Sequence, residues 1–453
     1  MPKKLWNKNF ILLLQGTAVS TIGDLMYSVA IGYWVYQKTN SSSLLAIMSS
    51  IAMFVTMFLS PFSGSMVDRL NRKWVLVLGD ALQGVIMLTV GVLAFLDKLN
   101  VVGVLIAAFL AALGGVFYSP ASNTVLVDII PRDEIERGQS LFSGVNSTIN
   151  MVGTAFSGAI VALLGVPIII IINGASNLYS AVSELLINVP KTSRQGQAIS
   201  LKGVLTDTKN ALKTVFKDPC LRIFIPSAII INFMSAGSFS LILPFIDQKG
   251  FSIEQYGLLM STWTIGSLIS VALLGTIKFK PKAKYLIMSI GFVLSEIMMI
   301  FAWLQVKFVP LCIFAILGAI GNTAGNTIFS AAMMLALPED KRGGILGLVT
   351  TASVGGTALS TLIYGFLGDI FPLYLVFVAG SALGIIPMLY MCLHPRTRQF
   401  ILNKQEQAPT TEGSSAEETP VEESIVEDPT QEPAIEASKV EEAITQDTSA
   451  DAE

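Results

Sequence analysis

Long apolar segments recur along the chain from Phe10 to Leu393, and they constrain the fold more than any other feature. Each is close to the roughly 20 residues that a helix needs to cross a hydrocarbon layer about 30 Å thick. Only 13% of the residues are charged, about half the proportion typical of a soluble domain. The segments are continuous, unlike the alternating ten-residue segments of a membrane β-barrel. The sequence therefore predicts an all-α membrane protein.

We expect twelve transmembrane helices, six on each side of a hydrophilic segment. The expected spans are 10–37, 43–66, 74–96, 101–130, 138–165, 167–190, 222–247, 254–277, 284–306, 309–337, 343–371 and 372–393. The first is too long for the apolar core of a cleavable signal peptide, so we expect it to remain as a helix. The expected domains are an N-terminal six-helix bundle over 1–190, a cytoplasmic linker over 191–221, a C-terminal six-helix bundle over 222–395 and a disordered acidic cytoplasmic tail over 396–453.

The charges are distributed unevenly. Residues 405–453 carry 15 acidic side chains, one lysine and no aromatic residue, a composition that cannot bury enough apolar surface to fold. With the N-terminus placed inside, 24 of the 29 Lys and Arg residues fall on the inner side of the spans and four on the outer side. By the positive-inside rule, both termini are expected to be cytoplasmic.

Two pairs of similar segments indicate an internal repeat. The segment 131–138 opens the fifth expected helix, as 338–343 opens the eleventh, and 152–158 (VGTAFSG) parallels 355–361 (GGTALST). Both copies lie on the same side of the membrane. The repeat therefore predicts two pseudo-symmetric halves in parallel orientation, an arrangement known from major facilitator transporters.

A ten-residue motif lies between the second and third expected helices. The segment from Gly64 to Lys73 reads GSMVDRLNRK and matches the major facilitator signature G-x-x-x-D-R-x-x-R-K at every signature position. The equivalent loop of the second half, 275–284, keeps a glycine and basic residues but has no acid. The chain thus resembles the major facilitator superfamily over roughly residues 10–395, and the resemblance implies the major facilitator fold.

Within the superfamily, the chain looks most like bacterial macrolide-efflux and siderophore-export transporters. The similar stretches are Trp34 to Ser42, Phe117 to Ala121 and Val127 to Pro131. The last two stretches also resemble lysophospholipid-flipping members. The resemblance implies a multi-pass protein of the plasma membrane, which is the bacterial inner membrane, acting as a monomer.

The motif has a physical interpretation as a conformational latch. Gly64 permits close helix approach, and Asp68 is an anion that the N-terminus of another helix would attract. In the family that helix is the eleventh, and Arg72 resembles the residue that pairs with an acid at the end of helix four, where Asp128 stands. Anchoring by Arg69, Arg72 and Lys73 alone explains the basic residues but leaves Asp68 unexplained.

Ionisable residues within the spans are candidates for function, since a charge in hydrocarbon is costly. Asp24 lies near the middle of the first helix and is our candidate for the proton-coupling residue, at which protonation and binding of a cationic substrate would compete. An interhelical hydrogen bond is the alternative role. Glu184 and Glu296 fall on helices that are peripheral in the family, so we expect them to make packing contacts, and Asp80 lies nearer an interface.

No Lys or Arg lies deep in any expected span, which favours a neutral or cationic lipophilic substrate over an anionic one. The resemblance implies that helices one, four, seven and ten line a central cavity. The candidate lining residues on these helices are Tyr27, Tyr33, Trp34, Tyr118, Asn123, Asn232, Phe233, Asn322 and Asn326.

These features predict a secondary active exporter that couples small-molecule efflux to protons within the lipid bilayer. Segment 153–158 partly matches the antiporter motif G-P-x-x-G-G, and helix packing explains it equally well. A lysophospholipid flippase and a non-transporting receptor or scaffold remain alternatives. One histidine, no metal-spaced cluster and no phosphate-binding loop indicate no enzyme activity, no catalytic residue, no metal and no cofactor. No nucleic-acid partner is expected.

Overall fold

The helical framework is seen in a computed structural model that describes residues 4–189, 209, 212–277, 279–337 and 342–406. Most of these residues are helical, and no strand occurs among them. Twelve of the helices are long and apolar enough to cross a membrane. Helices are the expected solution in hydrocarbon, because each one satisfies its own backbone hydrogen bonds. The prediction of twelve transmembrane helices is confirmed.

The N-terminal half contains the first six long helices and one 3₁₀ turn. They are α1 (Lys8–Thr39), α2 (Ser42–Arg69), α3 (Arg72–Phe95), α4 (Val101–Ile129), η1 (Arg132–Glu134), α5 (Ile135–Leu164) and α6 (Val166–Leu185). Polar side chains fix several helix starts: Asn7 accepts a hydrogen bond from Phe10 N at 3.0 Å and Asn100 from Gly103 N at 2.7 Å. Such caps satisfy amides that have no partner within the helix.

The C-terminal half contains six further long helices and the short helix α9. They are α8 (Leu221–Ser240), α9 (Ile242–Gln248), α10 (Ile253–Thr276), α11 (Pro281–Leu304), α12 (Phe308–Ala336), α13 (Arg342–Ile370) and α14 (Leu373–Leu393). The predicted continuous helix over 222–247 is wrong, because the chain leaves the helical conformation at Leu241. Pro244 explains this break: it has no N–H for the carbonyl of Ser240, and its ring would clash with that carbonyl in an unbroken helix.

The helix contacts repeat from one half to the other. In the first half, α3 packs on α6 and on α4, α1 on α6 and on α5, and α2 on α4. In the second half, the equivalent pairs are α11 with α14 and α12, α8 with α14 and α13, and α10 with α12. The two bundles are therefore pseudo-symmetric, as the sequence repeat predicts.

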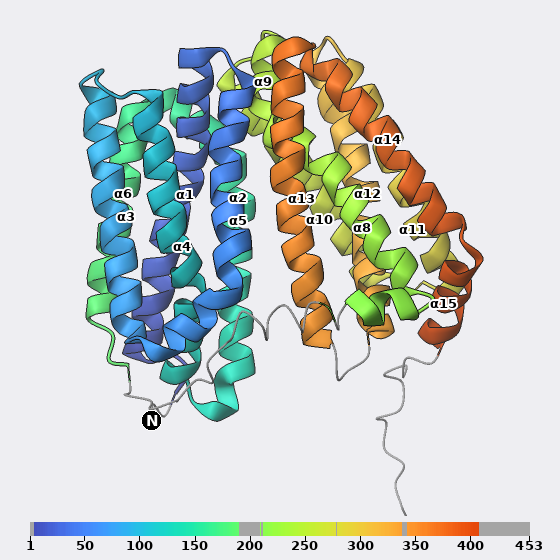
Figure 1. Ribbon diagram of the computed structural model, residues 1–453, viewed down its shortest axis with the longest axis horizontal. Coiled ribbons are helices and arrows are strands. Elements are labelled where there is room, and N and C mark those ends of the chain that lie inside the picture. The colour runs from blue at the N-terminus through green and yellow to red at the C-terminus, as the bar shows by residue number, and fades with distance from the viewer. Residues whose placement is uncertain (1–3, 190–208, 210–211, 278, 338–341, 407–453) are drawn as a thin grey trace, which may run out of the picture. The chain divides into compact units, whose positions relative to one another are not determined.

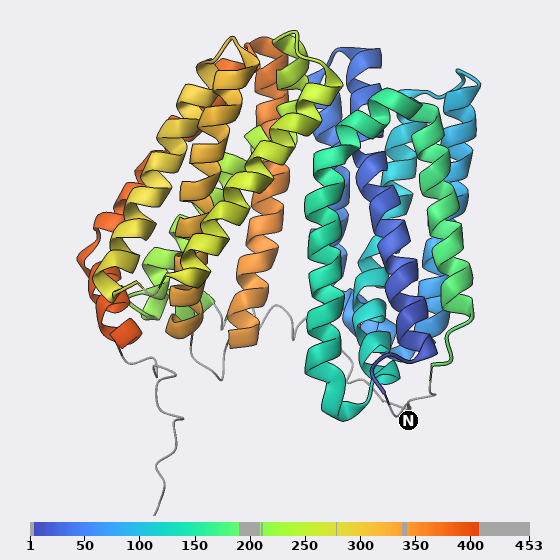
Figure 2. The same cartoon turned by 180° about the vertical axis from the view of Figure 1, so that it is seen from behind.

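The halves meet along two helix pairs, α2 with α13 and α5 with α10. Figure 1 shows α2 beside α13, and Figure 2 shows α5 beside α10 from behind. Both crossings are close. A Cβ on Gly158 would lie 2.5 Å from Ile253 O, and one on Gly365 would lie 3.0 Å from Ser42 O and against Ala46. Only glycine permits such an approach.

Hydrogen bonds between the halves gather at one face of the bundles. We call the face where α1 begins and α14 ends the terminal face, and the face with the α1–α2 and α13–α14 connections the opposite face. At the opposite face, the Asp369 carboxylate of α13 accepts hydrogen bonds from Ser42 N at 2.6 Å and from the Ser41 hydroxyl at 2.9 Å. Gln37 of α1 donates to Asp247 of α9 at 2.9 Å.

The start of the predicted tail needs a correction. Residues Pro395–Glu406 form helix α15, although the sequence analysis included 396–406 in a disordered segment. The helix is held by packing on α11 and α14, and the Phe400 ring lies edge-on to Phe224 at 5.7 Å. The rest of the tail, and most of the predicted linker, lie outside the described residues.

Candidate functional site

A cavity of about 390 Å³ lies in the C-terminal half, with its walls on α8, α10, α11, α12 and α14. Its volume falls within the 300–1,000 Å³ range of small-molecule sites. The side chains around it are apolar, aromatic and amide groups with several hydroxyls, and no Lys or Arg belongs to the described lining. Met53 of α2 and Thr357 of α13 also reach it, so both halves contribute.

Three of the predicted cavity residues line this space: Asn232, Asn322 and Asn326. The last two lie one helical turn apart on α12, where Asn326 Nδ2 donates to Asn322 Oδ1 at 2.9 Å. Phe233 is not among the lining residues. It lies beside α13, whose Ser360 hydroxyl donates to the Phe233 carbonyl.

Glu296 lines the same cavity, which the sequence analysis did not predict. It is 6% exposed, and Ser235 of α8 lies within 3.5 Å of its Oε1. The hydrogen bond connects α11 with α8, as expected of a packing residue. The side chain differs from that expectation in that it also lines the cavity. Small residues explain the difference: a Cβ on Gly384 of α14 would lie 3.9 Å from the Glu296 carboxyl carbon, so neither neighbour blocks its path to the cavity. The sequence contains this glutamate and the small residues Ser235 and Gly384, but a single sequence does not show that they lie next to one another in the fold.

The predicted aromatic residues of α1 lie elsewhere. Tyr27, Tyr33 and Trp34 are half-buried and pack against the large apolar core. Tyr33 also borders a smaller hollow of about 240 Å³ with Asp247. None of the three belongs to the 390 Å³ cavity in this conformation.

The two predicted residues of α4 also lie outside the cavity. Tyr118 is half-buried, and its hydroxyl donates to Glu184 Oε1 of α6 at 2.9 Å and lies 3.3 Å from the Thr17 hydroxyl of α1. Asn123 is exposed. Tyr118 therefore connects three helices of the first half.

Asp24 is half-buried on α1 and faces α3 and α6. Its Oδ1 accepts hydrogen bonds from Gln83 Nε2 at 3.1 Å and from Asn177 Nδ2 at 3.3 Å. These are interhelical bonds, of the kind that the sequence analysis gives as the alternative role of Asp24. No Lys or Arg among the described residues forms an ion pair with Asp24.

Two further carboxyl groups are buried in the same half. Asp80 of α3 is 5% exposed and Glu184 of α6 is 1% exposed. One oxygen of each, Asp80 Oδ2 and Glu184 Oε2, has no hydrogen-bond partner among the described residues. Together with Asp24, they place three acids between α1, α3 and α6.

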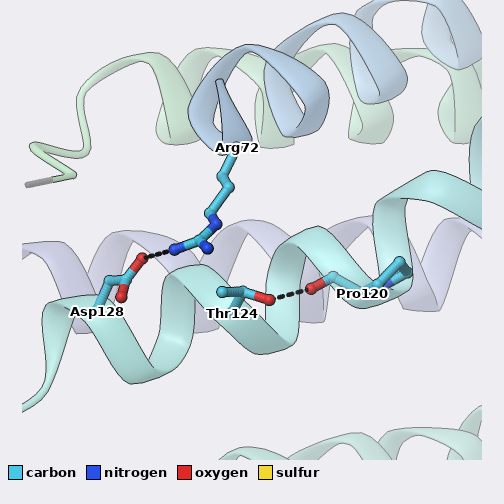
Figure 3. A network of polar contacts seen from close by, with 4 residues as sticks. All are labelled: Arg72, Pro120, Thr124 and Asp128. Atoms are coloured by element: carbon cyan, nitrogen blue, oxygen red, sulfur yellow. Dashed lines mark hydrogen bonds and ion pairs between the residues drawn. The ribbon is translucent and has the colours of Figure 1, made fainter. Parts of the chain in front are cut away.

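Arg72 and Asp128 form a buried ion pair at the terminal face, where Figure 3 shows Arg72 of α3 reaching Asp128 near the end of α4. Arg72 Nη1 lies 2.6 Å from Asp128 Oδ2, and the side chains are 7% and 11% exposed. One turn before Asp128, the Thr124 hydroxyl donates to Pro120 O at 2.7 Å, a back-bond that accompanies bent helices. The structure thus brings together the two residues that the motif analysis paired.

The other motif residues have different surroundings. Arg69 is exposed at the end of α2, and Lys73 is half-buried on α3. A Cβ on Gly64 would meet no described atom within 4 Å, so the close approach expected there is absent from this conformation. The side chain of Asp68 lies outside what the structure describes.

The partial antiporter segment belongs to helix packing. Gly158 forms the crossing with α10, and a Cβ on Gly153 would lie 2.7 Å from Leu25 of α1. The Ser157 hydroxyl donates to Thr154 O of its own helix. The small residues of α5 therefore serve contacts with two helices.

Two pseudo-symmetric bundles of six spans, joined through α2 with α13 and α5 with α10, define the class of major facilitator transporters. A solved structure of the same fold is a bacterial homologue of the human lysosomal transporter Spinster, inward-facing and unoccupied. It matches with a TM-score of 0.62 at 13% identity, covering 88% of this chain and 97% of that one. The predicted fold class is confirmed.

The chain belongs to the transmembrane secretion effector family, whose model matches residues 3–426. Multidrug efflux pump Tap of Mycolicibacterium fortuitum is 22% identical over 410 residues, which cover 86% of this chain and 97% of that protein. Macrolide efflux protein A of Streptococcus pyogenes is 23% identical over 194 residues, 43% of this chain. The matched part spans 48%, about half, of the length of that relative. The protein is a multi-pass membrane protein of the major facilitator type, and its predicted likeness to macrolide-efflux proteins is confirmed.

Proposed function

We propose that the protein is a proton-coupled exporter of lipophilic neutral or cationic small molecules that works by alternating access. The observation that carries this proposal is the 390 Å³ cavity, whose described lining combines aromatic and amide groups with one carboxylate and no basic side chain. Such a lining suits an apolar or cationic molecule and offers no counter-charge to an anion. The similarity to efflux pumps supports export as the direction.

The charge distribution supports a cytoplasmic terminal face. In this orientation the bonds from Asp369 to the start of α2 lie on the outer side of the membrane. They hold the halves together there, so this conformation receives substrate from the inside. Export then requires the opposite face to part and the terminal face to close around the motif of α2 and α3.

The proposed proton carrier is Asp24. Its partners Gln83 and Asn177 are neutral amides, and an amide offers both donors and an acceptor. The same neighbours therefore serve a carboxylate, which accepts N–H bonds, and a carboxylic acid, which donates to an amide oxygen. A Lys or Arg partner would instead hold the carboxylate permanently charged.

The motif residues are proposed to stabilise the state in which the terminal face is closed. The Arg72–Asp128 pair fixes the start of α3 on α4, and this anchors the connection that carries Asp68. Asp68 would then meet the start of α13 when the halves approach, where the helix dipole favours an anion.

The proposal is tested with purified protein in liposomes that carry a pH gradient. Wild-type protein is expected to move a lipophilic dye against its concentration gradient, and Asp24→Asn to bind the dye without gradient-driven movement. Asp97→Asn is the matched control: Asp97 is exposed in the α3–α4 connection, so its substitution is expected to leave transport unchanged.

Three outcomes would contradict the proposal. Normal gradient-driven transport by Asp24→Asn would remove this residue from the mechanism. Movement of lysophospholipid but of no dye would favour the flippase alternative. Absence of any substrate flux under every ion gradient would favour a receptor or scaffold.

A further inference from the structure

One ionisable side chain lines the cavity and has no part in the proposed proton coupling. Glu296 is the only acidic or basic residue in the described lining. It is 94% buried, since 6% of it is exposed. Its position, fifteen residues after the start of α11, places it about 22 Å along the helix and therefore well inside the membrane span.

The side chains around Glu296 leave its charge without a partner of opposite sign. Its hydrogen-bond partners are the neutral hydroxyls of Ser381 of α14 and of Ser235 of α8, the latter at a long 3.5 Å. Gly384 of α14 lies beside it. Tyr364 of α13 is a titratable group that faces Glu296, and its hydroxyl donates to Met234 O. No described Lys or Arg forms an ion pair with Glu296. A buried carboxylate without a cation is costly. A cationic ligand would therefore be stabilised by its interaction with the Glu296 carboxylate, for which the protein itself supplies no counter-charge.

The remaining walls suit the body of such a ligand. Phe239 of α8 and Trp263 of α10 both line the cavity, and their rings lie edge to face at 6.1 Å. Aromatic faces attract cations and bind apolar groups. Carboxylate and aromatic rings therefore surround one space, as in sites that recognise quaternary ammonium groups.

We propose that Glu296 is the specificity-determining residue of this cavity and that it selects lipophilic monovalent cations, with an ammonium or phosphonium centre on an aromatic or aliphatic body. This inference rests on the proposed transport function, because it assigns the substrate class of the same cavity. It separates two carboxylates by role: Glu296 contacts the substrate in the C-terminal half, and Asp24 carries the proton in the N-terminal half.

The test compares two ligands of nearly equal size, the cation methyltriphenylphosphonium and the neutral triphenylphosphine oxide. Equilibrium binding to the purified protein is measured for wild type, Glu296→Gln and Glu184→Gln. Loss of one charge-assisted contact predicts about tenfold weaker binding of the cation to Glu296→Gln, with less than about a twofold change for the oxide. Glu184→Gln is the matched control, because Glu184 is an equally buried glutamate outside the cavity, and it is expected to keep both affinities.

A measurement on the wild type covers the case in which Glu296→Gln does not fold. Dicyclohexylcarbodiimide modifies carboxyl groups in apolar surroundings, and mass spectrometry locates the modified residue. The phosphonium ion is expected to protect Glu296 and leave Glu184 reactive, whereas the phosphine oxide protects neither.

Equal weakening of both ligands, unchanged binding of the cation, or no protection of Glu296 would overturn the inference. So would failure of the wild type to bind the cation. Because these readouts need no transport, they are independent of the liposome experiment. Charge-selective binding at Glu296 without any flux would support the site and contradict the exporter.

Discussion

At the scale of single residues, three buried charged sites differ in their partners. Arg72 and Asp128 neutralise each other, Asp24 is held by neutral amides, and Glu296 lines the cavity. A buried ion pair, an amide-bound acid and an unpaired acid respond differently to substitution. Their partners therefore predict which changes act on stability and which act on transport.

The Arg72–Asp128 pair is expected to contribute to stability. Arg72→Met leaves the Asp128 carboxylate buried without its counter-charge, a loss of about 3–5 kcal/mol. The double variant Arg72→Met/Asp128→Leu removes both charges, and we expect it to be more stable than the single variant. Thermal unfolding in detergent, followed by tryptophan fluorescence, measures the difference in Tm.

A surface pair provides the control for this prediction. Arg137 and Glu134 lie 3.5 Å apart, but Arg137 is 67% exposed, so Arg137→Met should change stability by less than about 1 kcal/mol. If Arg72→Met unfolds no earlier than Arg137→Met, the buried pair does not stabilise the bundle.

The sequence shows which charged residues fall within or beside the membrane spans, but it predicts less well which residues they contact. The resemblance to the major facilitator family implies the pairing of Arg72 with Asp128, and the structure brings these two residues together. Helix number alone predicts packing contacts for Glu296, because the Ser235 and Gly384 positions that admit its carboxyl group to the cavity lie on two other helices. Side-chain direction depends on helix rotation and tilt, which a single sequence does not define.

At the scale of elements, apolar length determines the helices and local chemistry determines their ends. The fourth expected span, 101–130, differs by one residue from α4 at Val101–Ile129. The apolar run continues through Pro244 and therefore predicts one continuous helix, whereas the structure has a break between α8 and α9 there. The length of an apolar segment indicates that it spans the membrane. Proline instead removes a backbone hydrogen bond and so determines where the helix breaks.

The start of α2 differs from that of its counterpart α10. Ser252 and Gln255 form a capping box within α10, but α2 has no acid in its first turn and receives the Asp369 carboxylate from the other half. An anion at a helix N-terminus contributes about 0.3–1 kcal/mol. Asp369→Asn keeps an acceptor oxygen but removes the charge, so it should weaken closure of the opposite face.

The expected result is an opposite face that is open about two to five times more often. Ser50 reports this, because it is 1% exposed and its hydroxyl donates to Ala358 O of α13 at 3.1 Å. In a variant with the native cysteines replaced, Ser50→Cys should react faster with a membrane-impermeant maleimide when Asp369→Asn is present. Asp97→Asn, at the same face, is the control and should not change the rate. An unchanged rate in Asp369→Asn would mean that its charge does not hold the halves together.

At the scale of the whole molecule, the two crossings are equivalent contacts of a pseudo-symmetric pair. Gly158 of α5 approaches Ile253 and Gly257 of α10, and Gly365 of α13 approaches Ser42 and Ala46 of α2. Each half thus presents one helix that begins at the opposite face and one that ends there. Both crossings lie near the opposite face, because Ser42 and Ile253 are the first residues of α2 and α10. A rocking motion that separates the helices there would open the opposite face and close the terminal face, with the cavity between.

The central claim is therefore that the two faces open in alternation, and spin-label distances at both faces test it most directly. One pair of labels replaces Asp97 and Val306 in the connections of the opposite face, and the other replaces the exposed Asn71 and Lys282 at the terminal face. On addition of methyltriphenylphosphonium with a change of pH, the first distance is predicted to lengthen while the second shortens. Two distances that stay fixed, or that change in the same direction, would contradict alternating access by rocking halves.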